Sequence, residues 1–533
     1  MEIIGVKKNF LFLSYLLFNL ILIGVLLYFE YGYLFVSFFI FGGHVRDTFA
    51  IFIHMIGKCF GRKKWMKHRV YPVVNENSDV IDPNSNYIYS LVPVFNEDLD
   101  MVKQNLDSLS AQILPPGTVN TIVMVFDGLN DRNKGLFEAL NDLVVYDPEV
   151  VALSGEHEYL SWKNSDECKL VYRQGMYKGL RIVVSHKSSN KGKKDSLIVG
   201  EKLISDIFFA EHGKSNIFIY HTDGDTVADK NCLGELLKSM SDDVTLDGVS
   251  SLIRVYKRDG LSRKAWVFAV MQDFQYFYSL MVRRMAESAF SSTSCLPGCS
   301  NMIRVNEKSL AAINNYKNTP SNEEGLLQTV TRMQGTDRRY TTLLMREGAK
   351  LRMNWKAVVY TEPPLDIGSF IRQRRRWSSN SFFNSVVMLY SNVGIYVKIS
   401  GFIDICRMFT TIFRIFSYVV FWFYLDKFST LNIVLAVLFL ALPYIYCLGW
   451  AICLVPNWIY IVVGFFCNKL FMPLLSVTSI SKMFMTATNF DWGFSKATTQ
   501  SLEFGLDTSS EDDEEYCHSR VQEEIEELEE IEV

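Results

Sequence analysis

The residues in this sequence best suited to chemistry are Asp223 and Asp225, which one glycine separates directly after the apolar run 216–222. A hard divalent cation prefers oxygen ligands, and in nucleotide sites it takes most of its coordination from phosphates and water. Asp225 is therefore the candidate ligand for Mg²⁺ or Mn²⁺, and Asp223 the candidate for contacts to a ribose or to its own loop. Pairs of this kind are common by chance, so the interpretation needs support from other motifs.

Two other acidic turns end apolar runs in the same way. Pro93 and Glu97 lie at the end of the run 87–94, and Asp127 directly follows the run 121–126. Ordinary turns and helix caps also favour Asn and Asp at such points. The alternative is that these carboxylates accept hydrogen bonds from a uracil ring and its ribose.

Cationic residues between these motifs suit a diphosphate. Lys193 belongs to the segment 190–195 (NKGKKD), in which a glycine separates the lysines shortly before a helical pattern. A solvated lysine patch would have the same sequence.

Asp337, in the segment 335–339 (GTDRR), is the candidate catalytic base. A glycosyl transfer that inverts the donor carbon needs one base to take the proton from the acceptor hydroxyl. From the spacing alone, a structural ion pair between Asp337 and a neighbouring arginine is the simpler explanation.

Residues 373–377 (QRRRW) join three arginines to an indole. Gln373 and the arginine fork of Arg376 suit a diphosphate, and the face of Trp377 suits a sugar ring. A basic run next to apolar segments also suits lipid headgroups, which remains open for Arg374 and Arg375.

The elements that must position these residues belong to an α/β domain between about residues 86 and 360. Its strand-like runs alternate with polar or amphipathic stretches. In an open parallel sheet, ligands bind beyond the carboxyl ends of the strands. The acidic turns after the three runs should therefore meet in one crevice.

Apolar segments flank this domain. Residues 10–29 are long enough to span a bilayer and favour a retained span over a cleaved signal peptide. The stretch 33–56 contains His44, Arg46 and Asp47, so it is either a tilted span with its polar residues turned toward protein or a helix that leaves the membrane early.

On the C-terminal side, residues 366–400 read as interfacial amphipathic helices, and 408–425 and 431–453 as spans. The stretch 457–480 contains Pro473, which predicts a broken or re-entrant element.

The charge pattern bears on orientation and partners. Basic residues before the first apolar segment and after the second predict a cytosolic central domain. The tail 511–533 has twelve acidic residues and one arginine, and it receives no catalytic role. The ten cysteines form no zinc-site pattern, and no nucleic-acid partner is expected.

Over about residues 90–495, these motifs resemble in order those of the processive family-2 glycosyltransferases. Among these the chain is most similar to chitin synthases, and its compact form is also similar to viral-type hyaluronan synthases. The segment around Asp491 and Trp492 resembles the tryptophan-containing gating loop of these enzymes. Two residues depart from the pattern, since Thr336 stands where an acidic residue is usual and Phe494 where a threonine is usual. The motifs that carry the chitin synthase resemblance are 295–299 (CLPGC), 335–338 (GTDR), 340–343 (YTTL) and 373–378 (QRRRWS).

The resemblance implies a GT-A-like, mostly parallel sheet and a processive enzyme that extends a β-1,4-linked chain from UDP-N-acetylglucosamine. It implies that the product passes through the enzyme's own transmembrane helices. Trp377 would stack on the acceptor sugar, and Pro297 and Gly298 would line the acceptor site or channel mouth. The residues that would hold the UDP moiety are Pro93, Glu97, Asp127, Lys193, Asp223, Gln373 and Arg376.

The expected protein is thus a multi-pass membrane enzyme, in the plasma membrane, with a cytosolic catalytic domain; a homo-oligomer is left open. One alternative is a hyaluronan synthase, which needs UDP-glucuronate as a second donor. The other is a non-catalytic membrane receptor or transporter that binds a nucleotide.

The expected domains are a transmembrane hairpin (1–60), the glycosyltransferase domain (61–365), interfacial helices (366–400), C-terminal transmembrane helices (401–485), the gating loop (486–510) and the acidic tail (511–533).

Overall fold

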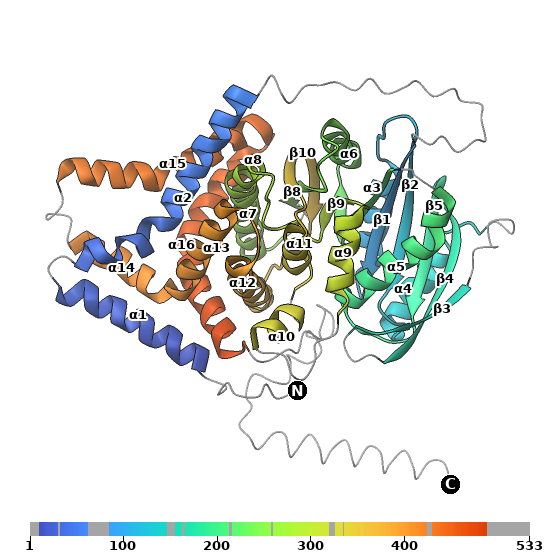
Figure 1. Cartoon of the computed structure of the whole chain (residues 1–533), viewed down its shortest axis with the longest axis horizontal. Coiled ribbons are helices and arrows are strands. Elements are labelled where there is room, and N and C mark those ends of the chain that lie inside the picture. Colours follow the sequence, from blue (N-terminus) through green and yellow to red (C-terminus); the bar gives the residue numbers. More distant parts are fainter. Residues whose placement is uncertain are drawn as a thin grey trace, which may run out of the picture. The chain divides into compact units, whose positions relative to one another are not determined.

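The computed structural model describes ten segments of the chain, which contain one ten-stranded sheet and the helices around it (Figure 1). The described residues are 10–29, 32–61, 85–146, 155–162, 166–212, 216–256, 260–318, 326–333, 335–423 and 429–487. The strands are β1 (Asn86–Val94), β2 (Thr118–Phe126), β3 (Gly155–Leu160), β4 (Glu167–Tyr177), β5 (Leu180–Lys187), β6 (Asn216–Thr222), β7 (Thr226–Ala228), β8 (Gly248–Val255), β9 (Ser300–Arg304) and β10 (Leu351–Thr361). The helices are α1 (Phe10–Tyr28), α2 (Gly32–Gly61), α3 (Leu99–Ser110), α4 (Asp131–Asn141), α5 (Lys193–His212), α6 (Cys232–Asp242), α7 (Arg263–Tyr278), the π-helical turn η2 (Ser279–Arg284), α8 (Met285–Ala289), α9 (Glu307–Tyr316), α10 (Leu326–Met333), α11 (Asp337–Arg346), α12 (Ile367–Tyr390), α13 (Ile395–Phe409), α14 (Thr411–Phe423), α15 (Thr430–Leu454) and α16 (Trp458–Met485).

The three predicted strands are β1, β2 and β6, and they are parallel neighbours near the middle of the sheet. The strand order is β3-β4-β5-β2-β1-β6-β9-β8-β10-β7, and β1 pairs in parallel with both β2 and β6. Every residue of β1 is buried, as expected of a parallel strand that is covered on both faces. The carboxyl ends of β1, β2 and β6 therefore lie at one edge, as the sequence predicts.

The sheet contains both parallel and antiparallel strands. The strand next to β6 on the side away from β1 is antiparallel to it, and this direction determines which residues reach the site. β9 runs antiparallel to both β6 and β8, and its first residue, Ser300, pairs with Thr222, the last residue of β6. An antiparallel strand begins at the edge where its neighbour ends. The segment that precedes β9, with Pro297 and Gly298, is thereby brought to the edge that carries Asp223.

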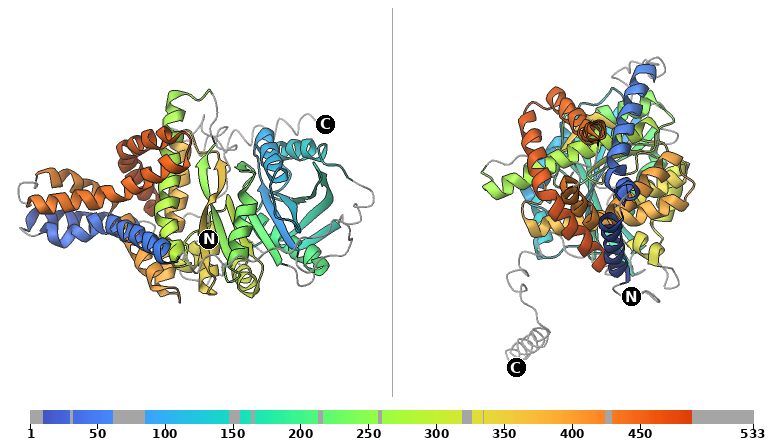
Figure 2. Two further views of the ribbon diagram at one scale, coloured as in Figure 1. Left: turned by 90° about the horizontal axis from the view of Figure 1, so that it is seen from above. Right: turned by 90° about the vertical axis from the view of Figure 1, so that its left-hand side faces the viewer.

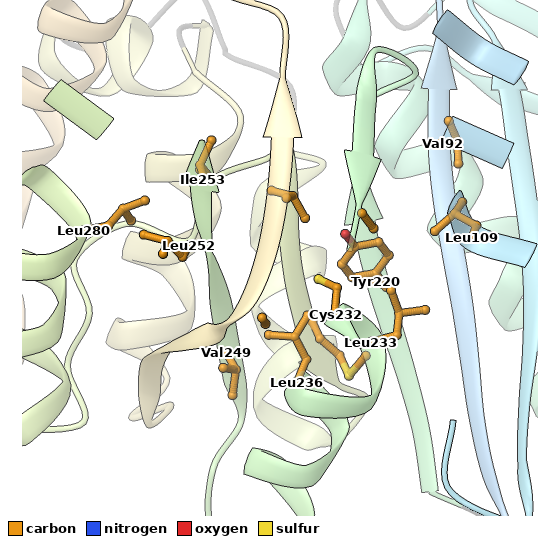
Figure 3. Close-up of a cluster of buried hydrophobic side chains, with 14 of the residues drawn as sticks. Val92, Leu109, Tyr220, Cys232, Leu233, Leu236, Val249, Leu252, Ile253 and Leu280 are labelled. Carbon is orange, nitrogen blue, oxygen red and sulfur yellow. The ribbon is translucent and has the colours of Figure 1, made fainter. Parts of the chain in front are cut away.

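A hydrophobic core holds these strands against the helices that cover them. In the close-up of Figure 3, side chains of β1, β6 and β8 meet side chains of α3, α6 and η2. Fully burying one such aliphatic side chain contributes about 1.5–3 kcal/mol, so this cluster fixes the strand ends firmly. The labelled residues are Val92, Leu109, Tyr220, Cys232, Leu233, Leu236, Val249, Leu252, Ile253 and Leu280.

Three described helices are long and apolar enough to cross a membrane: Phe10–Tyr28, Ile433–Leu454 and Trp458–Met485. They include the predicted spans 10–29 and 431–453 but not the predicted span 408–425, where the described helix α14 has only 13 residues. Figure 2 shows the ribbons of α1, α15 and α16, and α16 contacts both of the others.

The predicted break in 457–480 is absent, because α16 continues through Pro473 as one helix. Proline is tolerated inside membrane helices when neighbouring groups satisfy the freed backbone carbonyl. Lys469, a charged residue in the same helix, has its Nζ 3.6 Å from the centre of the Tyr444 ring on α15. This cation–π contact gives the charge a partner inside the helical segment.

The charged residues of α2 turn toward protein, as one of the two predictions for this stretch required. Arg46 and Asp47 are buried and lie 2.9 Å apart, and Arg46 also forms a 2.6 Å ion pair with Asp404 of α13. The predicted interfacial segment 366–400 comprises α12 and the start of α13. Its position at a membrane surface stays a prediction.

Candidate active site

The carboxylates after β1 and β6 lie against each other. A Cβ atom placed on Gly224 would lie 3.6 Å from the Cγ atom of Glu97, so the two loops are in contact. Burial raises the pKa of Glu97 to about 8, and the negative charge of Asp225 adds to this. Such crowding of negative charge favours a bound cation.

The donor set fits a metal ion that is only partly held by protein. Among the described residues, no group of three His, Cys, Asp or Glu side chains is placed to hold a metal by itself. Asp225 with the neighbouring carboxylates offers hard oxygen ligands, and a nucleotide diphosphate would have to supply others. This is how Mg²⁺ usually binds in nucleotide sites.

The Asp127 side chain connects the turn after β2 to β5 and to the segment before α5. Its carboxylate forms a 2.6 Å ion pair with the fully buried Lys187, and the backbone N–H of Lys191 donates to it over 2.9 Å. Gly128 follows with a φ of +79°, and a Cβ there would lie 2.7 Å from the backbone nitrogen of Asn190. The turn after β2 is therefore locked to the turn that leads into α5, while a contact of Asp127 with a nucleotide stays a prediction.

Lys193 is the first residue of α5, and its ammonium group donates to the carboxylate of Asp223. Partial burial would lower the pKa of Lys193, but the carboxylates of Asp223 and Asp337 outweigh this effect and raise it. Lys193 thus stays a cation, positioned beside the paired aspartates.

Asp337 is the first residue of α11. Gly298 donates its backbone N–H to one carboxylate oxygen over 3.2 Å, and the Thr336 hydroxyl donates to the other over 2.6 Å. Within the described part of the chain, no ion pair joins Asp337 to Arg338, whose charge instead interacts with Arg284 and Glu287. The structural ion pair that the spacing suggested is therefore not formed with Arg338 in this part of the chain.

Cys299 connects the aspartate pair to the candidate base. Burial raises the pKa of its thiol, and the charges of Asp223, Lys193 and Asp337 all act on it. Residues from β6, α5 and α11 thus converge on one place. Two of the predicted donor-binding residues, Lys193 and Asp223, are thus brought close to the predicted base.

Arg374 is not available to lipid, which corrects one reading of the basic run. Its side chain is buried, with the guanidinium 4.8 Å from the centre of the Phe370 ring and 4.4 Å from that of Trp377. Arg375 donates to the Thr486 hydroxyl over 3.2 Å. These contacts hold α12 in place, and the contact with Arg374 holds the Trp377 indole.

The remaining members of the run are the exposed Arg376 and Trp377 and the partly buried Gln373. Arg376 is exposed, and its charge interacts with Asp337. Trp377 is 43% exposed. The side-chain oxygen of Gln373 is buried without a hydrogen-bond partner among the described residues. A buried acceptor of this kind is costly, so a donor from a ligand would satisfy it.

Tyr276 of α7 is a site residue that the sequence did not indicate. Its ring centre lies 6.0 Å from that of Trp377. Burial raises the pKa of Tyr276 to about 12, opposed by Arg374 and reinforced by Cys299 and Asp225. No pattern in α7 could have revealed this role, because only the packing of α7 against α12 brings the two rings together. The predicted gating residues Asp491 and Trp492 lie outside the described residues.

A protein family described as "Chitin synthase" matches residues 214–530, which is more than half of the chain. Chitin synthase 8 of Gibberella zeae is 25% identical over 330 residues, which cover 56% of this chain and 49% of the relative. Chitin synthase csmA of Emericella nidulans is 24% identical over 358 residues, covering 57% and 18% respectively. The match thus spans about half of the first relative and less than a fifth of the second.

Solved structures show a more distant likeness. A mannosyltransferase of Pyrobaculum calidifontis in complex with GDP-Man and Mn²⁺ is 14% identical with a TM-score of 0.41, covering 80% of this chain and 99% of that one. TarS of S. aureus in complex with UDP-GlcNAc is 14% identical with a TM-score of 0.31, covering 75% and 90%.

Proposed function

The chain belongs to the chitin synthase family, and from that premise we propose that it polymerises N-acetylglucosamine from UDP-N-acetylglucosamine into β-1,4-linked chitin. The proposed enzyme is processive, inverts the donor carbon and passes the polymer across the membrane. The observation that carries the proposal is that Lys193 contacts Asp223 at the end of β6, where the turn before β9 contacts Asp337 through Gly298. Donor binding and acceptor activation then occur in one site.

In the proposed reaction, an acceptor hydroxyl oxygen bonds to the donor's anomeric carbon as the bond from that carbon to the diphosphate breaks. Asp337 takes the hydroxyl proton, and UDP leaves with the bonding electrons. The Gly298 N–H and the Thr336 hydroxyl hold the Asp337 carboxylate in a fixed orientation. A base held in this way needs little reorganisation when the proton moves.

The donor and acceptor would be held by different elements. Lys193 and Arg376 would neutralise the diphosphate, and Gln373 would meet a donor group of the substrate. The exposed face of Trp377 would stack on the acceptor sugar, beside Pro297 and Gly298. A sugar stacks best on an indole ring that is held in place. The Trp377 ring is held by its contacts with Arg374 and Tyr276.

Asp225 would hold Mg²⁺ or Mn²⁺, with Glu97 and Asp223 close by. When bound, such a metal neutralises charge that develops on the leaving diphosphate. We further propose that the catalytic domain is cytosolic, that the membrane is the plasma membrane, and that Asp491 and Trp492 form a gating loop.

The proposal is tested with membranes that contain the full chain and labelled UDP-N-acetylglucosamine as the sole donor. We expect insoluble polymer that chitinase degrades. Polymer that forms only after UDP-glucuronate is added would identify a hyaluronan synthase instead. No UDP release above a metal-chelated blank would favour a nucleotide-binding receptor or transporter.

A further inference from the structure

A buried polar chain runs behind the candidate active site, and the mechanism above does not use it. It contains Glu201 of α5, His221 of β6 and Asn301 of β9, which are 8%, 4% and 4% exposed. The Nε2 atom of His221 lies 2.9 Å from a Glu201 carboxylate oxygen, and its Nδ1 atom lies 3.1 Å from the side-chain oxygen of Asn301. Buried polar networks of this kind are costly unless every member is satisfied.

The chain ends at the turn that contacts the base. The side-chain amide of Asn301 donates to the Pro297 carbonyl over 2.8 Å, and the next residue, Gly298, donates its N–H to Asp337 over 3.2 Å. The peptide that links Pro297 to Gly298 therefore has its oxygen held by Asn301 and its N–H aimed at the base. Any rotation of this peptide would move both groups together.

The direction of the hydrogen bonds follows from this geometry. The Asn301 amide nitrogen faces the Pro297 carbonyl, so the Asn301 oxygen faces His221 and can only accept. The opposite amide orientation would set two oxygens against each other at Pro297. His221 must therefore carry a proton on Nδ1, and one more proton is shared between its Nε2 atom and Glu201.

A second contact closes the chain into a ring. The hydroxyl of Tyr340 donates to the other Glu201 oxygen over 3.5 Å, and the Tyr340 ring lies edge-on to His221 with centres 6.0 Å apart. Tyr340 is on α11, one turn after Asp337. The first turn of the helix that carries the base is thus tied to the network through Tyr340 and to the Gly298 turn through Asp337.

We propose that Glu201, His221 and Asn301 are positioning residues that set the Pro297–Gly298 turn and, through it, the orientation of the Asp337 carboxylate. The inference rests on the proposed function, because it assumes that Asp337 is the base. None of the three touches the reacting atoms. Their effect is on the rate of transfer and not on donor affinity, because the chain ends at the turn that contacts Asp337 and contains neither Lys193 nor the aspartate pair.

The test uses Asn301→Leu in the full chain, in membranes, with labelled UDP-N-acetylglucosamine. Leucine has a similar size but makes neither hydrogen bond. We expect kcat to fall on the order of 100-fold, because small displacements of a catalytic group have effects of this size. The dissociation constant for UDP should stay within about twofold of the parent value. Asn120→Leu is the matched control, since Asn120 is a buried asparagine of β2 that bonds to Ser90, far from the turn along the chain.

Glu201→Gln separates positioning from proton transfer. A glutamine amide can donate to His221 and so keeps the hydrogen bonds, but it cannot hold the shared proton. Positioning predicts that Glu201→Gln has at least tenfold the kcat of Asn301→Leu. If Asn301→Leu binds no UDP, Glu201→Gln decides alone, and a loss as large as that of Asp337→Asn overturns the proposal.

The remaining outcomes are also decisive. A kcat for Asn301→Leu equal to that of Asn120→Leu, with Asp337→Asn inactive, overturns the positioning role and leaves the proposed function intact. Polymer synthesis by Asp337→Asn would instead contradict the base assignment itself.

Discussion

At the scale of single residues, the site separates groups that bind from the group that reacts. Lys193 and Asp223 are paired with each other, so a diphosphate must compete for the lysine. Asp337 accepts hydrogen bonds from Gly298 and Thr336, which orient its carboxylate, while the charges of Lys193 and Arg376 act on it. A general base needs such a fixed direction toward the proton that it accepts.

Asp337→Asn should abolish polymer synthesis while UDP binding persists. The amide keeps the shape of the side chain but cannot accept a proton, and loss of a general base costs about 10²–10⁴-fold in rate. Incorporation of labelled sugar and equilibrium binding of UDP measure the two effects. Asp142→Asn, an exposed carboxylate beyond the end of α4, is the control.

Trp377→Ala should impair chain elongation more than UDP binding, because the indole is expected to contact the acceptor and not the nucleotide. Trp377→Phe retains an aromatic face and should recover part of the rate. Polymer length and UDP affinity are the measurements. Equal loss of both in Trp377→Ala would count against stacking.

At the scale of elements, the site depends on how α11 begins. Gly335, two residues before Asp337, has a φ of +80°, and a Cβ there would overlap the side-chain amide of Asn380 on α12. The close approach of this turn to α12 sets the distance between the base and the residues 373–377. A β-carbon at this position would require the Asn380 side chain or the two helices to move.

Gly335→Ala should therefore destabilise the protein more than Gly348→Ala. Gly348 has a φ of +73° but no atom within 4 Å of its Cβ position. Its substitution should cost only the left-handed backbone strain of about 1–2 kcal/mol. Overpacking at Gly335 should add about 1–3 kcal/mol. Thermal unfolding in detergent compares them, and equal midpoints would show that Asn380 yields freely.

At the scale of the whole molecule, ion pairs join segments from opposite ends of the sequence. Arg46 of α2 pairs with Asp404 of α13, and the Tyr278 hydroxyl before η2 donates to Asp47 over 2.9 Å. Helix α2 is thereby attached both to α7 of the α/β domain and to α13 among the C-terminal helices. Burial makes such pairs sensitive to the loss of one partner.

Arg46→Met should lower stability by about 3–5 kcal/mol, because it leaves Asp47 and Asp404 buried with less compensation. Lys169→Met removes an exposed cation that lies 3.7 Å from Glu156, and it should change stability by less than about 1 kcal/mol. Thermal unfolding of the two purified variants in detergent provides the comparison. Similar midpoints would mean that the α2 pairs add nothing.

Local pattern was sufficient for the donor side of the site. β1, β2 and β6 are continuous apolar runs followed at once by acidic turns, so the runs predicted adjacent parallel strands with their turns at one edge. The same reasoning failed at Pro473, where α16 continues unbroken. Whether a helix continues through a proline depends on its contacts with neighbouring helices, which a sequence does not show.

The acceptor side was harder to predict because its parts come from distant segments. Tyr276, Arg374 and Trp377 form one stack only because α7 packs near α12, and Arg374 is buried there although the sequence allowed it to face lipid. The ring through Glu201 and His221 had no sequence signal either, since each residue lies in a regular helix or strand.

The sequence by itself determined the family, the strands that end in carboxylates and the identity of the candidate base, because these depend on short motifs and local periodicity. Only the tertiary structure decided how they meet. The antiparallel course of β9 brings Pro297 and Gly298 to the end of β6, next to Asp337 of α11. Such pairing is settled by the burial of side chains far apart in the chain, and no local pattern specifies it.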